Sequence, residues 1–141
     1  MLRIFKQLLR PIERRKYVRS LINATVSFRI VDSNNPAIHS RVLQGKVFDV
    51  SQEGLCIGTN LVQIDGLHVF HPSSQHKNNL EIEVKLDPDL PSMKTFGEVK
   101  WYSKVEEEIG WIYRMGVTWL SLGDNDQQTL KNFLKTKTYH K

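Results

Sequence analysis

Two clusters of polar residues have the types and the spacing to bind a small anionic ligand. The first cluster, RRKYVR, supplies Arg14, Arg15 and Arg19. The second cluster, DVSQEG, supplies Asp49, Ser51 and Gly54. An arginine guanidinium forms charge-assisted and often bidentate hydrogen bonds with phosphate oxygens. It also matches the O6 and N7 acceptors of guanine, so the first cluster has the chemistry of a nucleotide-binding group.

The second cluster has complementary chemistry. Residues two apart on a strand share a face, so the side chains of Asp49 and Ser51 should point the same way. A carboxylate such as that of Asp49 can accept hydrogen bonds from the N1–H and N2–H₂ donors of guanine. Gly54 then provides a turn with positive φ or one in which a ligand can approach the backbone closely. Each motif alone is a weak signal, but the two together predict a site for a small, doubly anionic guanine nucleotide.

Alternating apolar and polar residues predict the strands that must position these clusters. The clearest alternation runs from Leu80 to Leu86, and further strands are expected within residues 24–30, 42–50, 55–57, 97–101 and 111–120. Asp124, with Gln127 three residues later, predicts the start of a C-terminal helix. Strands and helices do not alternate, which excludes a doubly wound nucleotide-binding sheet. We therefore predict an all-β fold with a C-terminal helix, in which six short antiparallel strands close into a barrel.

Length and composition fit this fold. The chain has 141 residues and a mass of 16.4 kDa, which corresponds to one domain. With 40% hydrophobic and 25% charged residues it is not a disordered chain. No apolar run approaches the ~20 residues that a membrane-spanning helix needs. The single cysteine, Cys56, cannot form an intramolecular disulfide, so we expect a reducing, cytoplasmic environment.

The positive charge of the chain is concentrated at its N-terminus. The net charge is +5, but residues 1–20 hold seven basic residues and one acidic residue, whereas residues 21–141 hold 13 basic and 14 acidic residues. Apolar residues recur in this arm at helical spacing: Leu2, Phe5, Leu8, Leu9 and Ile12. We interpret residues 1–12 as a basic amphipathic arm that docks on its own domain or on a partner. Contact with a membrane surface and a frayed terminus are the less favoured alternatives.

The residues that could carry catalysis or bind a metal do not form a reactive site. His68, His71 and His76 share the long loop 59–79, but their spacing matches no established zinc pattern. Cys56 lies in an apolar stretch and is expected to be buried packing and not a nucleophile. The acidic run 106–108 lies between two predicted strands and is interpreted as a solvated turn. We therefore expect no enzyme activity, no metal and no cofactor.

The order of the motifs resembles that of the PilZ domain. The resemblance runs from about Glu13 to Leu134, and it is carried by Arg14-Arg15-x-x-x-Arg19, Asp49-x-Ser51-x-x-Gly54, Gly97-x-Val99-x-Trp101 and Gly116-Val117-Thr118-Trp119. It implies a six-stranded antiparallel PilZ-type β-barrel with a C-terminal helix. It also implies a receptor for the bacterial messenger cyclic di-GMP. The chain then divides into the arm 1–12, the domain 13–135 and a basic C-terminal tail 136–141.

The resemblance also implies a role for each motif residue. Arg15 and Arg19 would bind the phosphates and guanine, with Arg14 assisting them. Asp49 and Ser51 would bind a guanine edge, and Gly54 would shape the loop around it. Trp101 is a candidate for stacking on a base, with packing in the barrel core as the alternative.

From these observations we expect a stand-alone cyclic di-GMP receptor, because only a short arm precedes the motifs. The ligand would change the conformation of the arginine-bearing arm, and the signal would pass to an unidentified effector protein. Motility and biofilm-related processes are the outputs that the family suggests. Two alternatives remain open: a barrel that binds single-stranded nucleic acid through its basic arm, and a PilZ-like protein-interaction domain without a ligand. We expect no nucleic-acid partner.

Overall fold

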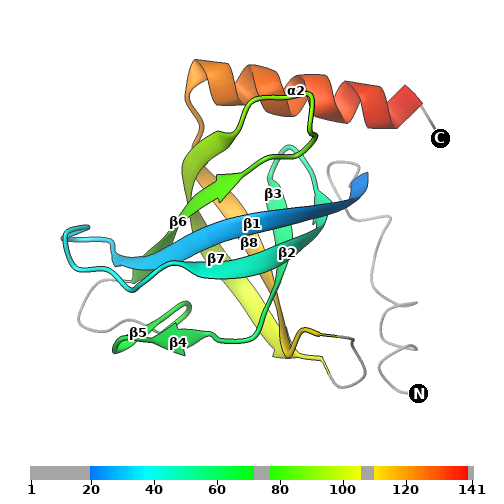
Figure 1. Ribbon diagram of the computed structural model, residues 1–141. Coiled ribbons are helices and arrows are strands. Elements are labelled where there is room, and N and C mark those ends of the chain that lie inside the picture. The colour runs from blue at the N-terminus through cyan, green and yellow to red at the C-terminus, as the bar shows by residue number, and fades with distance from the viewer. Residues whose placement is uncertain (1–19, 72–76, 106–109, 140–141) are drawn as a thin grey trace.

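Six antiparallel strands close into a barrel in the computed structural model, which describes residues 20–71, 77–105 and 110–139 (Figure 1). The barrel strands are β1 (Ser20–Asp32), β2 (Leu43–Val50), β3 (Gly54–Thr59), β6 (Asn78–Val84), β7 (Met93–Lys104) and β8 (Tyr113–Ser121). Around the barrel their order is β1-β2-β3-β8-β7-β6, and β6 pairs with β1 to close it. The predicted six-stranded barrel is therefore confirmed.

The interior of the barrel follows from the alternation in the sequence. Leu80, Ile82 and Val84 of β6 face inward and meet Phe28 and Ile30 of β1, all of them almost completely buried. Each of these side chains is removed from water on folding, which stabilises the barrel by roughly 1.5–3 kcal/mol per large apolar side chain. The clearest alternation in the sequence thus forms one wall of the core.

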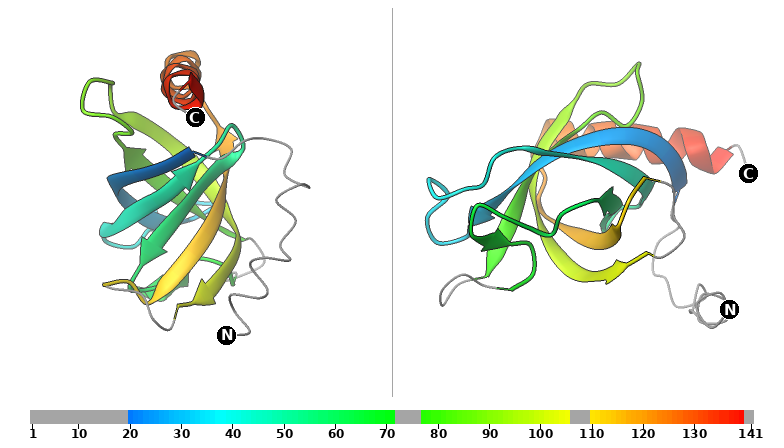
Figure 2. Two further views of the ribbon diagram at one scale, coloured as in Figure 1. Left: turned by 90° about the vertical axis from the view of Figure 1, so that its right-hand side faces the viewer. Right: turned by 60° about the horizontal axis from the view of Figure 1, so that its bottom comes forward.

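The C-terminal helix, α2 (Asp124–Tyr139), lies across one end of the barrel (Figures 1 and 2). Leu130 and Phe133 are buried in the core, as their helical spacing predicts. Residues 136–139, expected as part of a tail, continue the helix. No helix in the described part of the chain is long and apolar enough to span a membrane.

A small hairpin in the long loop was not predicted. It pairs β4 (Gln63–Ile64) with β5 (Leu67–His68), near the end of the barrel opposite α2 (Figure 1). Its turn residues, Asp65 and Gly66, both have positive φ, at 57° and 80°, which two-residue hairpin turns require. The Asp65 carboxylate accepts hydrogen bonds from the backbone N–H of Arg41, at 2.8 Å, and from its guanidinium, at 3.0 Å. These bonds attach the hairpin to the segment before β2.

Two β-bulges change which residues face outward. In β2, Val47 pairs with Ile57 but Asp49 pairs with Cys56, so Phe48 is an extra residue. In β7, Val99 pairs with Val117 but Trp101 pairs with Gly116, so Lys100 is an extra residue. A bulge puts two residues opposite one and reverses the inward and outward alternation beyond it. Both Val47 and Val50 are therefore in the core, and Asp49 and Trp101 lie on the outer wall.

The hairpin turn gives a test of backbone strain. Gly66→Ala places a side chain at φ 80° with no atom within 4 Å, so the cost is conformational and should be about 1 kcal/mol of unfolding free energy. Gly123→Ala is the matched control, because that position is equally open and has no positive φ. Urea denaturation should show the loss for Gly66→Ala only. Equal stability of the two variants would contradict the assignment of the turn.

Candidate functional site

The register of four neighbouring strands brings the predicted site residues together. Asp49 of β2 pairs with Cys56 of β3, Cys56 pairs with Gly116 of β8, and Gly116 pairs with Trp101 of β7. This row lies on the outer wall, because the residues on either side of Cys56, Leu55 and Ile57, face the core. Cys56 itself is buried within the row. Asp49 and Trp101, 52 positions apart in the sequence, therefore belong to one surface.

Trp101 lies against the backbone of the adjacent strand. A Cβ at Gly116 would collide with the indole Nε1 of Trp101, so only glycine allows the ring to approach β8 this closely. The side chain of Trp101 is half-buried and lies outside the apolar core. The structure thus places Trp101 on the outer wall, outside the barrel core, and its stacking on a base stays a prediction.

A tight turn holds Ser51 and Gly54. The Ser51 N–H donates to the Gly54 carbonyl at 2.8 Å, and the Ser51 Oγ accepts a hydrogen bond from the Glu53 N–H at 3.2 Å. A Cβ at Gly54 would collide with the carbonyl oxygen of Val117. Gly54 has no positive φ, so glycine is required here because β3 and β8 lie so close together. This differs from the turn geometry that the sequence suggested.

Trp119 fixes the same turn from the other side. Its indole Nε1 donates to the Ser51 carbonyl at 3.3 Å, and its backbone N–H donates to the Glu53 carbonyl at 2.9 Å. Trp119 is half-buried against the core, and its role in anchoring the turn was missed. No sequence signal identifies this role, because the indole and the turn meet only when β3 pairs with β8.

These elements enclose a cleft of about 190 Å³ on the outer wall. It is lined by Asp49, Ser51, Glu53, Gly54, Leu55, Lys100, Trp101, Gly116, Val117 and Thr118. The structure therefore brings together Asp49, Ser51, Gly54 and Trp101 of the predicted set. The three arginines of the first cluster, Arg14, Arg15 and Arg19, lie outside the described residues. Lys100 was missed because it is the bulged residue of β7.

Lys100 is the one basic residue among the described residues that line the cleft, beside the carboxylates of Asp49 and Glu53. Its Nζ lies 3.2 Å from a carboxylate oxygen of Glu98, and the Nζ of Lys77 lies 3.0 Å from the other oxygen. The hydrogen bond from Lys77, followed by that from Lys100, lowers the pKa of the Glu98 carboxyl below its usual value. The cleft thus combines an acceptor carboxylate, an ammonium donor and an indole, which are groups suited to binding a polar aromatic anion.

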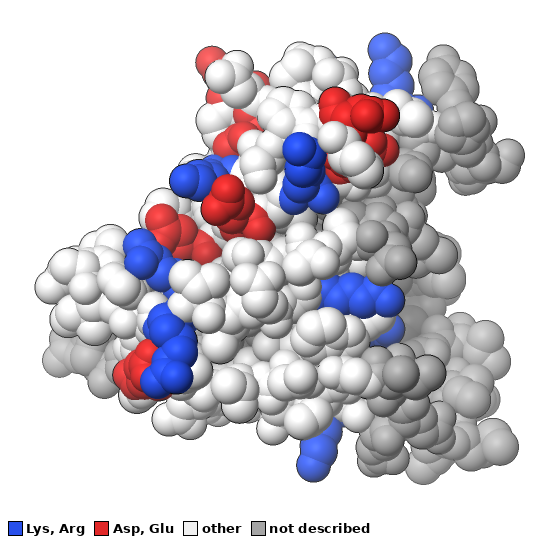
Figure 3. Space-filling model, viewed as in Figure 1, with Lys and Arg blue, Asp and Glu red and all other residues white. Residues whose placement is uncertain are grey.

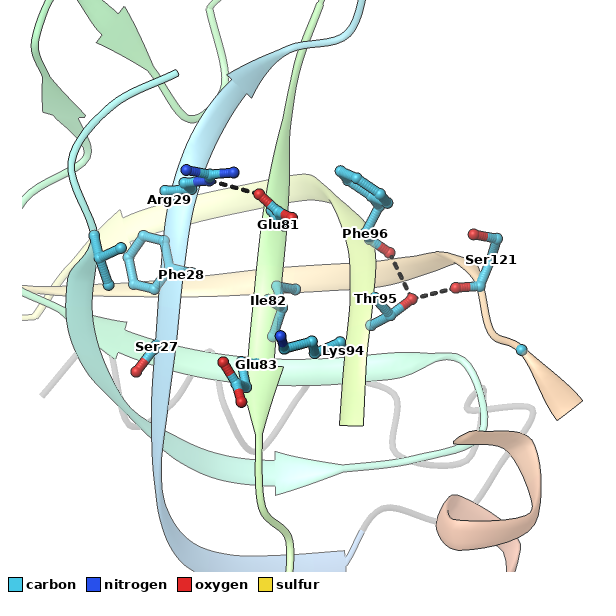
Figure 4. A pocket seen from close by; sticks show the side chains of 12 residues that line it. Ser27, Phe28, Arg29, Glu81, Ile82, Glu83, Lys94, Thr95, Phe96 and Ser121 are labelled. Atoms are coloured by element: carbon cyan, nitrogen blue, oxygen red, sulfur yellow. Dashed lines mark hydrogen bonds and ion pairs between the residues drawn. The ribbon is translucent and has the colours of Figure 1, made fainter. Parts of the chain in front are cut away.

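A larger hollow of about 490 Å³ lies elsewhere, on the outer face of β1, β6 and β7 (Figure 4). Its charges are paired with one another: Arg29 bonds to Glu81, and Glu83 lies opposite Lys94 in the strand register. The hydroxyl of Thr95 donates to a carbonyl oxygen at its edge (Figure 4). Figure 3 likewise shows acidic and basic side chains interspersed on the upper and left parts of this face. None of the described residues that line this hollow belongs to the predicted ligand site.

The loop histidines have a structural role. The Nδ1 of His68 accepts hydrogen bonds from the backbone N–H groups of Phe70 and His71, at 2.9 and 3.1 Å. Its ring contacts those of His71 and Tyr102, at centroid distances of 4.4 and 5.4 Å. Burial, with a smaller effect of His71, lowers the pKa of His68. Within residues 20–71, 77–105 and 110–139 no three His, Cys, Asp or Glu side chains are grouped to hold a metal, and His76 and the acidic run 106–108 lie outside these ranges.

The chain matches one protein family model, and its fold is similar to those of several solved structures. A family model described as the PilZ domain matches residues 13–136. The structure of the Bacillus subtilis inhibitor of motility, MotI/DgrA, aligns with a TM-score of 0.62 at 17% identity, covering 92% of this chain and 54% of that one. The PilZ domain with c-di-GMP of YcgR from Escherichia coli aligns at 0.62 and 13% identity, covering 90% and 93%.

The structure described as MrkH, a c-di-GMP-dependent transcription regulatory factor, aligns with a TM-score of 0.64 at 14% identity, covering 91% of this chain and 52% of that one. The chain thus spans about half the length of the MotI/DgrA and MrkH structures. At these identities the likeness shows a shared fold. No curated protein matched the chain.

The Glu98 pairing predicts a pH-dependent contribution to stability. A carboxyl whose pKa is lowered by folding stabilises the protein at pH values above its usual pKa of 4.5. This contribution is lost as the pH falls through the folded-state pKa. Because Glu98 is partly exposed, Glu98→Gln should reduce the unfolding free energy at pH 7 by about 0.5–1 kcal/mol. Urea denaturation from pH 7 to pH 3 should show that the difference in unfolding free energy between wild type and Glu98→Gln shrinks once the pH falls below 4.5. A difference that stays constant to pH 3 would argue against the ion pairs.

Proposed function

The chain belongs to the PilZ domain family, and from this premise we propose that it is a receptor for cyclic di-GMP that acts by binding and not by catalysis. The observation that carries the proposal is the convergence of Asp49 of β2, Ser51 of the turn that follows β2, and Trp101 of β7 on one outer cleft. The comparison fold of the YcgR PilZ domain, described with c-di-GMP, supports the same ligand.

Each cleft group has a role in this proposal. The Asp49 carboxylate accepts hydrogen bonds from the N1–H and N2–H₂ donors of one guanine. The Ser51 turn presents backbone polar groups beside it, and the Trp101 indole offers a face for a base. Lys100 adds a cation for a phosphate oxygen. Together these groups would hold one nucleotide unit against the outer wall.

The arginine cluster completes the site through the connectivity of β1. Ser20 pairs with Val50 and Leu21 pairs with Asp49, so the start of β1 lies beside the cleft. Arg14, Arg15 and Arg19 come shortly before Ser20 in the sequence, so the chain that carries them leads directly into this end of β1. We propose that Arg15 and Arg19, assisted by Arg14, bind the ligand phosphates from this side. Ligand binding would then change the conformation of the arm.

The output of the receptor is proposed to pass through a partner protein. The Ser51 turn, which we propose contacts the ligand, is hydrogen-bonded to Trp119, and Trp119 also lines a groove between β8 and α2. A change at Ser51 can therefore reach a second surface of the barrel. The fold neighbours are described by different outputs, motility inhibition for MotI/DgrA and transcription for MrkH, which supports a shared input domain with interchangeable partners.

Isothermal titration calorimetry with cyclic di-GMP tests the ligand. Wild-type protein should bind, and Asp49→Ala should bind at least about tenfold more weakly because a hydrogen-bond acceptor for guanine is lost. Asp89→Ala is the matched control, an exposed aspartate between β6 and β7 that should leave affinity unchanged. Arg15→Ala/Arg19→Ala should abolish measurable binding. Absence of heat with the wild type refutes the ligand assignment.

Hydrogen exchange tests the response of the arm. Amides of residues 10–20 should exchange more slowly on saturation with cyclic di-GMP, because a ligand shifts a conformational equilibrium by its differential affinity for the two states. The amides of β6, on the other side of the barrel, serve as the internal control. Unchanged protection of residues 10–20 at saturation would show that the arm does not respond.

The nucleic-acid alternative has a separate signature. Because the MrkH neighbour is described as a transcription regulatory factor, binding to single-stranded and duplex DNA should be measured in parallel. Affinity for DNA that falls steeply with salt and does not depend on Asp49 would favour this alternative over the receptor.

A further inference from the structure

Two positive charges converge on one aromatic ring beside the cleft. The Nζ of Lys46 lies 5.2 Å from the centroid of the Phe48 ring, and the guanidinium Cζ of Arg114 lies 4.4 Å from it. Phe48 is the bulged residue that directly precedes Asp49. The bulge in β2 that turns Asp49 toward the cleft therefore also positions the aromatic ring that the two cations contact.

The strand register places these cations in the row next to the site row. Lys46 of β2 pairs with Gly58 of β3, and Gly58 pairs with Arg114 of β8. A Cβ at Gly58 would be 2.5 Å from Cε2 of Phe48, so the ring covers the glycine that separates the two cations. Arg114 is two residues before Gly116 on β8, and successive outward residues of a strand are about 7 Å apart. The cationic row and the cleft are thus continuous.

The charges of this row lack anionic partners in the described part of the chain. There, Arg29, Arg41, Lys77 and Lys100 each have a carboxylate within 4 Å. Within the same described part, Lys46 and Arg114 form no such pair, and neither do the exposed residues Lys85, Lys94, Lys104, Lys131 and Lys135. The Nε of Arg114 is buried and has no hydrogen-bond acceptor.

This arrangement is unfavourable unless an anion joins it. Burying a guanidinium nitrogen without an acceptor costs free energy, and two like charges near one ring repel each other. The aromatic face offsets part of this cost and holds the guanidinium in one orientation. A guanidinium held in this way loses less side-chain entropy when it binds an anion than a freely rotating one does.

We propose that Lys46 and Arg114, positioned by Phe48, form an anion subsite that takes a phosphodiester group of the ligand bound in the adjoining cleft. The inference rests on the proposed function and extends its ligand site along the barrel wall. It also bears on specificity, because a ligand must carry a second phosphate to reach both the cleft and the subsite. A cyclic dinucleotide meets this requirement, and guanosine monophosphate does not.

The first test is calorimetry with cyclic di-GMP. Arg114→Met keeps an unbranched side chain against Phe48 but removes the charge, and we expect affinity to fall about tenfold or more. Lys46→Met should weaken binding in the same direction, and the affinity of both variants should depend less on salt. Lys94→Met is the matched control, because Lys94 is exposed on the outer face away from this row. Variants with wild-type affinity would overturn the subsite, even if Arg114→Met lowers the melting temperature.

A second measurement separates the subsite from the receptor proposal. The ¹H–¹⁵N signal of the Arg114 Nε–H group is followed in wild-type protein during titration with inorganic pyrophosphate, against sodium chloride at matched ionic strength. The subsite predicts a larger shift with pyrophosphate, whether or not cyclic di-GMP binds. If cyclic di-GMP gives no heat but this shift occurs, the receptor proposal fails and the anion subsite stands. If the shift is the same with both salts, the subsite is wrong.

Discussion

The site depends on the register of β2 and β7 against their neighbours. If Phe48 and Lys100 were ordinary paired residues, strict alternation after the inward-facing Val47 and Val99 would turn Asp49 and Trp101 toward the barrel interior. An unpaired carboxylate in that interior would cost several kcal/mol, and the indole would need space that the packed core does not have. The two bulges solve both problems and place a carboxylate and an aromatic ring on one outer surface.

Small residues make this surface possible. Gly58 and Gly116 lie on the outer side of β3 and β8, where Phe48 and Trp101 from the flanking strands fold over them. A glycine without neighbours weakens a strand, but here a ring covers each one and replaces the side chain that is missing. The barrel wall therefore carries a second apolar layer outside the core, with polar and charged groups at its margins.

Much of the fold could be predicted from the sequence, because alternation such as that of Leu80 to Leu86 is a local property. Asp49 and Ser51, which the sequence singled out by their spacing, do line one cleft. The bulges could not be predicted, because a bulge is defined by how a strand pairs with its neighbour and leaves no mark in the strand's own sequence. For this reason the outward position of Trp101 and the place of Lys100 in the cleft were not predicted. The β4–β5 hairpin was missed because its strands have two residues each, although the Asp65–Gly66 pair was a usable signal.

The packing of Gly54 changes how its motif should be interpreted in other proteins. A side chain at this position would collide with the backbone of β8 whether or not a ligand is present. Selection for a folded barrel is therefore sufficient to retain this glycine in a related protein that binds no ligand. Retention of Gly54 by itself is therefore evidence for the barrel and carries no information about a ligand.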